Sequence, residues 1–454
     1  MKNGKKEAHP LSEKNITTLS PEFDRSVKID FTGETVTSNA GVIMLAELDD
    51  KLGIIGDIAS RLSDPRNPEF TVHTMRGLLA QRLFCIAAGY EDGDDADDLR
   101  GDPALRRATG RKKEDAVLAS QPSISRLENK LLLIGENLNV IKVSNLDVAI
   151  RYYKMKGAKH IWLDIDSYES PVHGEQEGSA YNGYYTSNCY HPLVLHDGFG
   201  FKLKVELRAG NEYTSTGAAA FLEPVFRRLT DEGFKIHLTA DSGFADPDIF
   251  KLCSSYLVIY FIRLKSNAVL QREVEHLLTR PPGRPPKGPL VRYAGFHYKA
   301  DTWDCYRRVI AKATHNPGEM FAEIYFLVIN SPVPNKEAFR RYGLRRGRAE
   351  QRNDEGKNMM FSTRLSCHEE KANDARLQLY SLAYNFMVLF RRLTLTGDEK
   401  KWTLDTIRLR LMKIGARVTH GSHYTRFLFA AGPALLRLVA NIFNRIRRLP
   451  EPCR

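Results

Sequence analysis

The sequence has 454 residues, of which 42% are hydrophobic and 27% charged, and this balance excludes a largely disordered chain. Lysine and arginine total 67 against 55 acidic residues, so the formal net charge is +12 and a polyanionic partner such as nucleic acid is favoured. No stretch approaches the roughly 20 apolar residues of a membrane-spanning helix, and the six cysteines lack the spacing of zinc ligands. We expect a cytoplasmic protein of about two to four domains that binds no membrane.

The first third of the chain predicts a flexible arm followed by helices. Residues 1–30 are polar and rich in lysine, which is typical of a loose N-terminal arm. Over residues 31–150, apolar side chains recur at helical spacing and predict an all-helical region that would bind DNA. Its segment LASQPSISRLENK predicts a helix with Arg126 and Lys130 on one side, which would either contact DNA or pack as an ordinary helix.

Residues 151–264 change to strand patterns. The segment HIWLDID alternates apolar and polar side chains as a strand does, and two further strands, a helix, a strand, a helix and a strand follow it. This order begins as an antiparallel meander and continues with parallel crossovers. It is typical of the ribonuclease H-like fold, so we predict an α/β protein whose catalytic core is a mixed sheet of that kind.

The rest of the chain divides into three predicted regions. Residues 265–335 hold a proline-rich segment and then strand patterns, and predict a β-rich insertion. Helical spacing returns over residues 336–395, which would complete the core. Residues 396–454 predict a strand pair at about residues 408–429 and a final basic amphipathic helix, and would bind DNA or form a dimer.

Two strand ends carry aspartates. Asp164 and Asp166 share one face of the first strand, and Asp241 directly follows the fourth strand. In a parallel crossover fold these strand ends meet at one edge of the sheet. Each aspartate alone would be read as a turn or cap residue, but together they predict a cluster of carboxylates at this edge.

A third carboxylate lies on the predicted helix after the insertion. At helical spacing Tyr342, Arg346, Glu350 and Lys357 fall on one face, within a run of arginines that exceeds what one glutamate can balance. The conservative interpretation is a solvated, salt-bridged helix, whereas a DNA backbone would match the excess of cations. Three carboxylates in a basic cleft would hold two magnesium ions, which serve phosphodiester chemistry.

These residues resemble the DDE transposases of bacterial insertion sequences, in the branch with a Tyr-Arg-Glu-Lys signature, insertion-sequence family thirteen-eighty. Arg346, Glu350 and Lys357 keep the intervals of that signature, whereas Tyr342 stands four residues before the arginine instead of three. The first aspartate is also followed differently, by Ser167 and Tyr168, where the family tends to have threonine at the second position. The segments that resemble this branch span most of the chain: AGVIMLAELDDKLG, GYEDGDDADDLRGDPAL, LASQPSISRLEN, LDIDSYESPVHGEQEG, ADSGF and RGRAEQRNDEGKN.

The resemblance implies roles for particular residues. Asp166, Asp241 and Glu350 would be both the catalytic residues and the metal ligands, with Asp164 as the alternative to Asp166, and would hold two Mg²⁺ ions that Mn²⁺ may replace. Tyr342, Arg346 and Lys357 would contact DNA. Trp303 of the β-rich insertion would hold a flipped base, with a core tryptophan as the alternative.

The resemblance also implies the function. A bacterial, nucleoid-associated homodimer would bind the terminal inverted repeats of its element, cleave the ends by two-metal hydrolysis and join the 3′-hydroxyls to target DNA. Two alternatives remain open. One is a structure-selective nuclease on the same core, and the other is a domesticated DNA-binding protein without catalysis.

Overall fold

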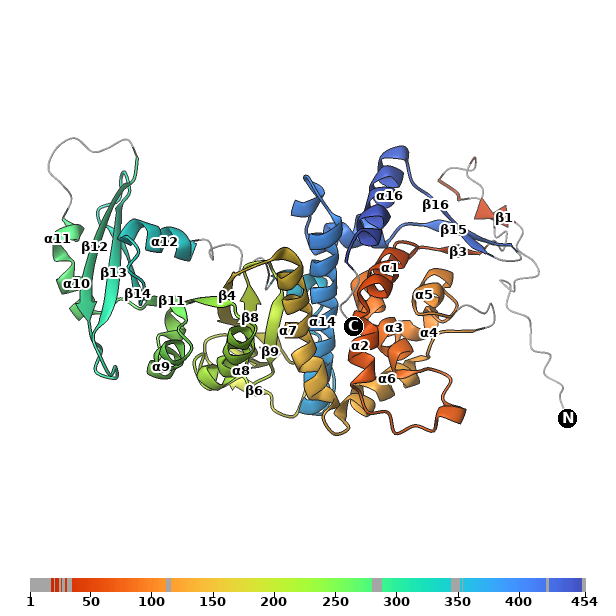
Figure 1. Ribbon diagram of the computed structural model, residues 1–454, viewed down its shortest axis with the longest axis horizontal. Helices are drawn as coiled ribbons and strands as arrows, with labels where there is room; N and C mark the ends of the chain where they lie inside the picture. The colour runs from red at the N-terminus through yellow and green to blue at the C-terminus, as the bar shows by residue number, and fades with distance from the viewer. Residues whose placement is uncertain are drawn as a thin grey trace.

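The computed structural model describes residues 18–19, 21–23, 26, 29–30, 35–111, 116–279, 288–343, 352, 354–421 and 424–450. The protein is a mixed α/β molecule whose main sheet has eight strands. In Figure 1 the N-terminal helices lie at one end, strands β12 to β14 lie at the other, and the long helix α14 stands between the N-terminal helices and the sheet.

The N-terminal part is helical and contributes to the main hydrophobic core. Its described α-helices are α1 (Val42–Leu52), α2 (Ile54–Ser60), α3 (Met75–Ala88), α4 (Asp95–Asp98), α5 (Pro103–Ala108), α6 (Gln121–Asn129) and α7 (Asn137–Lys156). Helix α3 is buried along nearly its whole length and packs against α14. From Leu78 to Ala88 every residue of α3 is buried, so this part of the helix lies inside the core.

The central sheet positions the candidate site. Strands β4 (His160–Ser167), β10 (Lys235–Ala240) and β11 (Ile259–Leu264) are parallel, and β8 (Leu193–Asp197) and β9 (Lys202–Glu206) continue the sheet beyond β4 as antiparallel neighbours. Helices α8 (Ala218–Asp231) and α9 (Pro247–Ser255) make the crossovers. This order and these directions are consistent with a ribonuclease H-like core, and the succession of elements follows the sequence pattern.

The region after β11 extends the same sheet. Helices α10 (Ala268–Glu273) and α11 (Glu275–Leu278) come first, and then strands β12 (Leu290–Tyr298), β13 (Arg307–His315) and β14 (Glu323–Ile329). Strand β14 pairs antiparallel with β11, so the eight strands run in the order β12-β13-β14-β11-β10-β4-β8-β9. The proline-rich segment at residues 280–287 lies outside the described residues.

Three short strands between β4 and β8 do not appear in the sequence pattern. They are β5 (Ser170–Pro171), β6 (Ala180–Asn182) and β7 (Ser187–Tyr190), and they form a separate sheet in the order β5-β7-β6. Alternation cannot be recognised over two to four residues, because a strand is predicted from alternating apolar and polar side chains only over a longer run.

The C-terminal part is built around α14. Helix α12 (Asn335–Gly343) is followed by the π-helical turn η4 (Glu355–Met359), and α14 (Glu370–Thr394) packs on α3, α7, α16 and β9. Beyond it lie α15 (Leu404–Ile407), the π-helical turn η6 (Arg408–Met412), β15 (Ala416–His420), β16 (Thr425–Phe429) and α16 (Pro433–Arg447). The predicted strand pair is present, but its predicted start at Arg408 is wrong, because residues 408–412 continue a helix. No helix in the described ranges is both long and apolar enough to cross a membrane.

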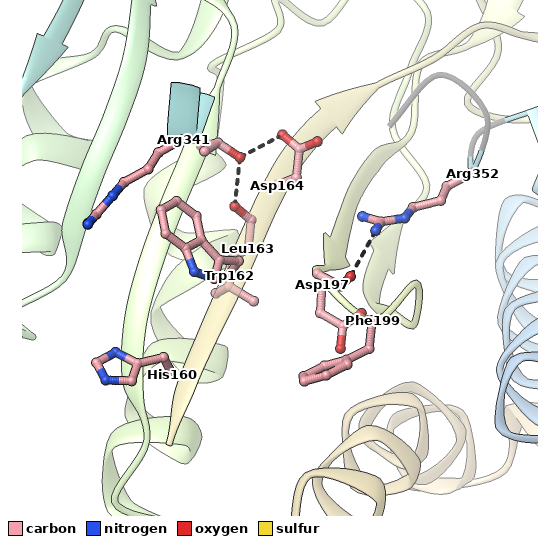
Figure 2. Close-up of a pocket in the computed structure, with 10 residues that line it drawn as sticks. His160, Trp162, Leu163, Asp164, Asp197, Phe199, Arg341 and Arg352 are labelled. Carbon is pink, nitrogen blue, oxygen red and sulfur yellow. Dashed lines mark hydrogen bonds between the residues drawn. The ribbon is translucent and has the colours of Figure 1, made fainter. Parts of the chain in front are cut away.

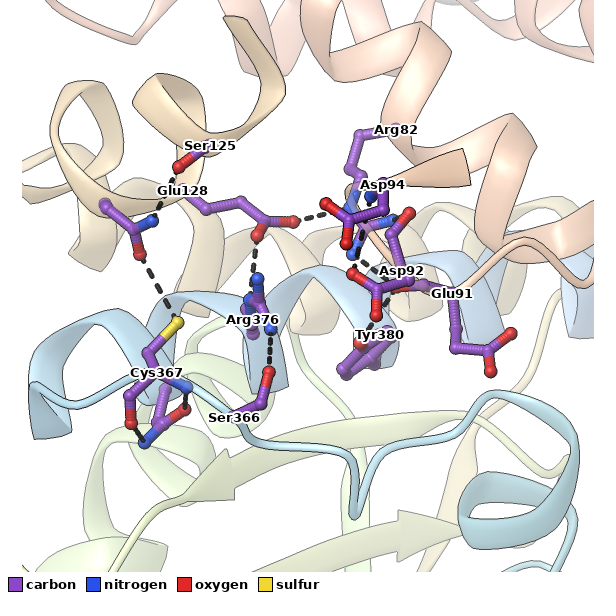
Figure 3. A network of polar contacts seen from close by, with 12 residues as sticks. Arg82, Glu91, Asp92, Asp94, Ser125, Glu128, Ser366, Cys367, Arg376 and Tyr380 are labelled. Atoms are coloured by element: carbon purple, nitrogen blue, oxygen red, sulfur yellow. Dashed lines mark hydrogen bonds and ion pairs between the residues drawn. The ribbon is translucent and has the colours of Figure 1, made fainter. Parts of the chain in front are cut away.

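A buried ionic network joins the N-terminal helices to α14 (Figure 3). The carboxylate of Glu128 on α6 is fully buried and accepts hydrogen bonds from Arg82 Nε of α3 at 2.5 Å and from Arg376 Nε of α14 at 2.8 Å. The guanidinium of Arg82 also lies 5.8 Å from the ring centroid of Tyr380. Three helices that are far apart in the sequence are therefore fixed to one another by one carboxylate.

Candidate active site at the edge of the central sheet

Two of the predicted carboxylates lie side by side at the carboxyl edge of the sheet. Strands β4 and β10 are parallel, and their last paired residues are Ile165 and Ala240. The next residue on each strand is Asp166 or Asp241, so the register places them as neighbours on one sheet face. Both aspartates are half-buried. The edge therefore presents two adjacent carboxylates that are accessible from solvent.

Local hydrogen bonds hold both aspartates in turns. Asp166 Oδ1 accepts from the backbone N–H of Ser167 at 2.9 Å, and Asp241 Oδ1 accepts from the backbone N–H of Gly243 at 2.8 Å. The second bond caps the short 3₁₀ turn η3 (Ser242–Phe244). Each of these bonds uses one carboxylate oxygen, and a carboxylate has lone pairs for several partners. The donor set suits a hard cation such as magnesium.

Asp164 lies two residues before Asp166 in β4 and so further from the carboxyl edge of the sheet. Its side chain is 5% exposed, and its Oδ1 accepts from the Thr239 hydroxyl at 3.3 Å. A ligand that is enclosed between strands is less accessible to a hydrated cation than one at the edge. This burial favours Asp166 over Asp164 as the first ligand.

The third predicted ligand, Glu350, lies outside the described residues, as does Arg346. In the described part of the chain no group of three or more His, Cys, Asp or Glu side chains is arranged to hold a metal ion. Tyr342 lies in α12 and packs near Trp162 of β4 in a small hydrophobic cluster. Lys357 lies in η4, and the helical face predicted to run from Tyr342 to Lys357 crosses residues 344–351, which lie outside the described residues.

The chain on both sides of Glu350 nevertheless approaches the face of β4 that carries the aspartates. A pocket of about 200 Å³ on this face is lined by Trp162 and Asp164 of β4, by Arg341 of α12 and by Arg352 (Figure 2). Arg352 donates a hydrogen bond to the backbone oxygen of Gly198 at 3.1 Å. Two guanidinium groups from the predicted arginine-rich segment therefore border the same sheet face.

Lys357 lies against the continuation of β4. Its ammonium is 5.1 Å from the ring centroid of Tyr168, which follows Asp166 by two residues. Burial raises the pKa of Tyr168 to about 12, so the ring stays neutral and presents its face to the cation. The structure thus brings Lys357 close to the end of the strand that carries Asp166.

Lys202 is a candidate residue that the sequence pattern missed. The register places Asp164, His196 and Lys202 in one row across β4, β8 and β9, and all three side chains are buried. The ammonium of Lys202 lies 5.3 Å from the ring centroid of Tyr384. Burial and the nearby Lys357 lower the pKa of Lys202 to about 8. Helix α14 covers this face of β9, and the alternation within the strand does not reveal that contact.

Tyr185 is a second candidate that sequence reasoning did not single out. It follows β6 and is half-buried, and burial together with the neighbouring Asp166 carboxylate raises its pKa. No motif marks this tyrosine, because its nearness to Asp166 depends on the tertiary fold of the segment between β6 and β7.

The remaining predicted DNA contacts differ in exposure. Arg126 in α6 and Lys130 at the end of that helix are both exposed, whereas Trp303 is only 5% exposed. The indole packs against Phe250 and Tyr298, with ring centroids 5.3 and 5.5 Å away. In this conformation Trp303 corresponds to the core alternative and not to a base contact, because its ring has no face open to DNA.

Comparison with known protein families identifies the family of this chain. The family model described as transposase DDE domain, group 1, matches residues 19–451, which is nearly the whole chain. No curated protein matches the sequence. The match covers the strands that carry Asp166 and Asp241, the segment with Glu350 and the C-terminal helices. The chain therefore belongs to the DDE transposase family.

Proposed function

We propose that the protein is the transposase of an insertion sequence, of family thirteen-eighty, that binds the terminal inverted repeats, cleaves the DNA at the ends and joins the 3′-hydroxyls to target DNA. The observation that carries the proposal is the pair Asp166 and Asp241 on adjacent parallel strands in a chain of the DDE family. A basic chain of net charge +12 suits the DNA partner.

Asp166, Asp241 and Glu350 would together hold two Mg²⁺ ions, which Mn²⁺ may replace. When bound there, such ions activate the attacking water or hydroxyl and stabilise the departing oxygen of the phosphodiester. Support for Glu350 comes from its neighbours in the chain, because Arg341 and Arg352 both line the pocket on the β4 face. The carboxylates would also orient the ions relative to the phosphate.

The cations around this edge would hold the DNA. Lys357 beside Tyr168, together with Arg346 and Tyr342, would contact phosphates near the scissile bond. The exposed Arg126 and Lys130 would contact the transposon end as part of a helical DNA-binding region, residues 31–150. Phosphate contacts supply affinity, whereas a few base contacts supply specificity.

The same proposal includes the domain division and the assembly. The core would comprise residues 151–264 and 336–395, interrupted by the insertion at 265–335. The C-terminal residues 396–454 would bind DNA or form the homodimer of the synaptic complex. Extension of the sheet by β14 supports a rigid attachment of the insertion to the core.

The test is a reconstituted reaction with Mg²⁺, a donor DNA bearing the inverted repeats that flank the gene, and a target plasmid. The wild-type protein should yield joined products, and Asp166→Asn, Asp241→Asn and Glu350→Gln should abolish cleavage while end binding remains. The exposed Asp248→Asn on α9 is the matched control and should behave as wild type.

The same reaction separates the alternatives. Cleaved but never joined ends would indicate a structure-selective nuclease, and DNA binding without metal-dependent cleavage would indicate a domesticated DNA-binding protein. If the Glu350→Gln protein joins the DNA ends to the target plasmid as wild type does, the three-carboxylate mechanism is refuted.

A further inference from the structure

The row of residues at the carboxyl edge continues from the aspartates onto a cation. The last apolar row is paired across β4, β10 and β11, and the next residue on each strand is Asp166, Asp241 or Arg263. Residues that are opposite one another in a sheet share a face, so Arg263 is the neighbour of Asp241 on the side of the insertion. Lys265 lies two residues further along the same face.

A pocket of about 400 Å³ adjoins this row. It is lined by the turn that follows Asp241, by Arg263 and Lys265, and by the rings of Tyr213 and Tyr325. Tyr213 is 68% exposed, so its side chain is accessible from solvent. The volume falls within the roughly 300–1,000 Å³ of small-ligand pockets, so it admits a nucleotide and not a duplex.

The face beyond the pocket alternates aromatic and cationic side chains. Tyr325 on β14 pairs with Lys312 on β13, which pairs with Tyr293 on β12. The guanidinium of Arg263 lies 4.8 Å from the ring centroid of Tyr325. One carboxylate, that of Glu323, accepts a hydrogen bond from the Tyr325 hydroxyl. A strip of cations and rings therefore leads away from Asp241 across the insertion.

The cations of this strip are not neutralised by any residue that the structure describes. Arg263, Lys265 and Lys312 have no ion-pair partner in the portion of the chain that the structure describes. Lys251 on α9, by contrast, pairs with Asp248 at 3.6 Å. Unpaired cations that alternate with tyrosines fit a sugar-phosphate backbone whose bases stack on the rings.

We propose that Arg263, Lys265, Lys312, Tyr213 and Tyr325, here named the insertion track, bind a single strand of the substrate DNA as it leaves the catalytic edge. A nucleotide next to the scissile phosphate occupies the pocket, with its phosphate between Arg263 and Lys265 and its base against a tyrosine. The proposal rests on the proposed function, since the track begins at Asp241. An unpaired strand is favoured over a duplex by the pocket volume and by the rings, because base faces are available for stacking only when the strand is unpaired or frayed.

The experiment measures binding in EDTA, so that it does not depend on cleavage. Fluorescence anisotropy would compare a blunt duplex of one transposon end with the same duplex carrying a single-stranded extension, between about 50 and 200 mM salt. For the extended probe, the double variant Arg263→Gln with Lys265→Gln should reduce the slope of log K against log salt by about 1.4, since each single-strand phosphate contact contributes about 0.7. The blunt duplex should show no change.

Further variants ensure that the result does not depend on one variant that fails to fold. Lys312→Gln should lower the slope for the extended probe by about 0.7. Tyr325→Ala should weaken that probe roughly 5- to 150-fold, and Tyr325→Phe should retain its binding, because stacking needs the ring and not the hydroxyl. The exposed Lys251→Gln on α9 is the control and should leave both probes unchanged.

Two results would overturn the insertion track. One is an unchanged slope of log K against log salt for the extended probe in the double variant. The other is an equal decrease of that slope for the extended probe and the blunt duplex, which would assign these cations to duplex DNA. These outcomes are separate from the failure of the proposed function. If the wild-type protein binds the extension through Arg263 but never cleaves with Mg²⁺, the insertion track is supported and the transposase function is refuted.

Discussion

Neutralising Glu128 should destabilise the whole protein, because this carboxylate compensates the buried guanidinium of Arg82 and the mostly buried guanidinium of Arg376. Glu128 is fully buried, and it accepts from Arg82 at 2.5 Å and from Arg376 at 2.8 Å (Figure 3). In Glu128→Gln the amide oxygen can still accept one bond, but the amide N–H₂ would face a guanidinium donor. Breaking a buried ion pair by removal of one partner costs about 3–5 kcal/mol.

The remaining contacts of the two arginines set the expected value at the lower end of that range. Arg82 Nη2 also donates to the backbone oxygen of Glu91 at 2.7 Å, and Arg376 Nη1 donates to the Ser366 hydroxyl at 2.6 Å. These bonds keep the guanidinium groups partly compensated in the variant. We therefore expect a loss of about 3 kcal/mol in the free energy of unfolding.

The assay is urea unfolding followed by circular dichroism, with the variant and wild type compared at one protein concentration. Glu223→Gln is the matched control, because Glu223 pairs with Arg227 at 3.3 Å on the surface, and that change should cost at most about 0.5 kcal/mol. A Glu128→Gln protein whose stability lies within about 1 kcal/mol of wild type would refute the reasoning that a buried charge needs this partner.

Three further predictions follow from burial and exposure. Burial and Lys357 lower the pKa of Lys202 to about 8, so between that pH and the ordinary pKa of 10.5 the unfolded chain binds more protons than the folded protein. As pH rises through this window, the free energy of unfolding of wild type should therefore increase by about 3 kcal/mol relative to that of Lys202→Met. Urea unfolding at a series of pH values measures this difference. Trp303→Phe should lower stability by roughly 1–3 kcal/mol while leaving the Kd for end DNA unchanged, and a selective loss of DNA binding would restore the base-contact prediction. Arg126→Gln with Lys130→Gln should reduce the salt slope for duplex ends by about 1.8, and an unchanged slope would indicate that α6 is only a packing helix.

The sequence predicted the features of the core that depend on local pattern. Alternation along HIWLDID located β4, and the placement of Asp166 and Asp241 at strand ends followed from the parallel crossover, because such ends meet at one edge. It also predicted the helix that carries Arg126. These features need only the periodicity of one segment and the rules of connection.

The features that the sequence missed depend on which segments pair. Arg263 is a neighbour of Asp241 only because of the register between β10 and β11, which no local pattern specifies. Lys202 is buried because α14, nearly two hundred residues later, covers β9. Trp303 was placed by resemblance in a DNA-contacting role, and its packing between Phe250 and Tyr298 follows instead from how the insertion folds onto α9.

Helix α14 connects the parts of the molecule on which the proposed reaction depends. Near its start, Arg376 binds the carboxylate of α6; in its middle, the Asn385 side chain bonds both backbone groups of Lys202 in β9, at 2.8 and 2.7 Å. Near its end, Arg391 pairs at 3.4 Å with Glu355 in the turn that also carries Lys357. A site is precise when its side chains stand on rigid elements. One buried helix thus contacts the candidate DNA-binding helix, the edge strand of the core and the turn that carries the lysine beside Tyr168, and it holds all three on one rigid element.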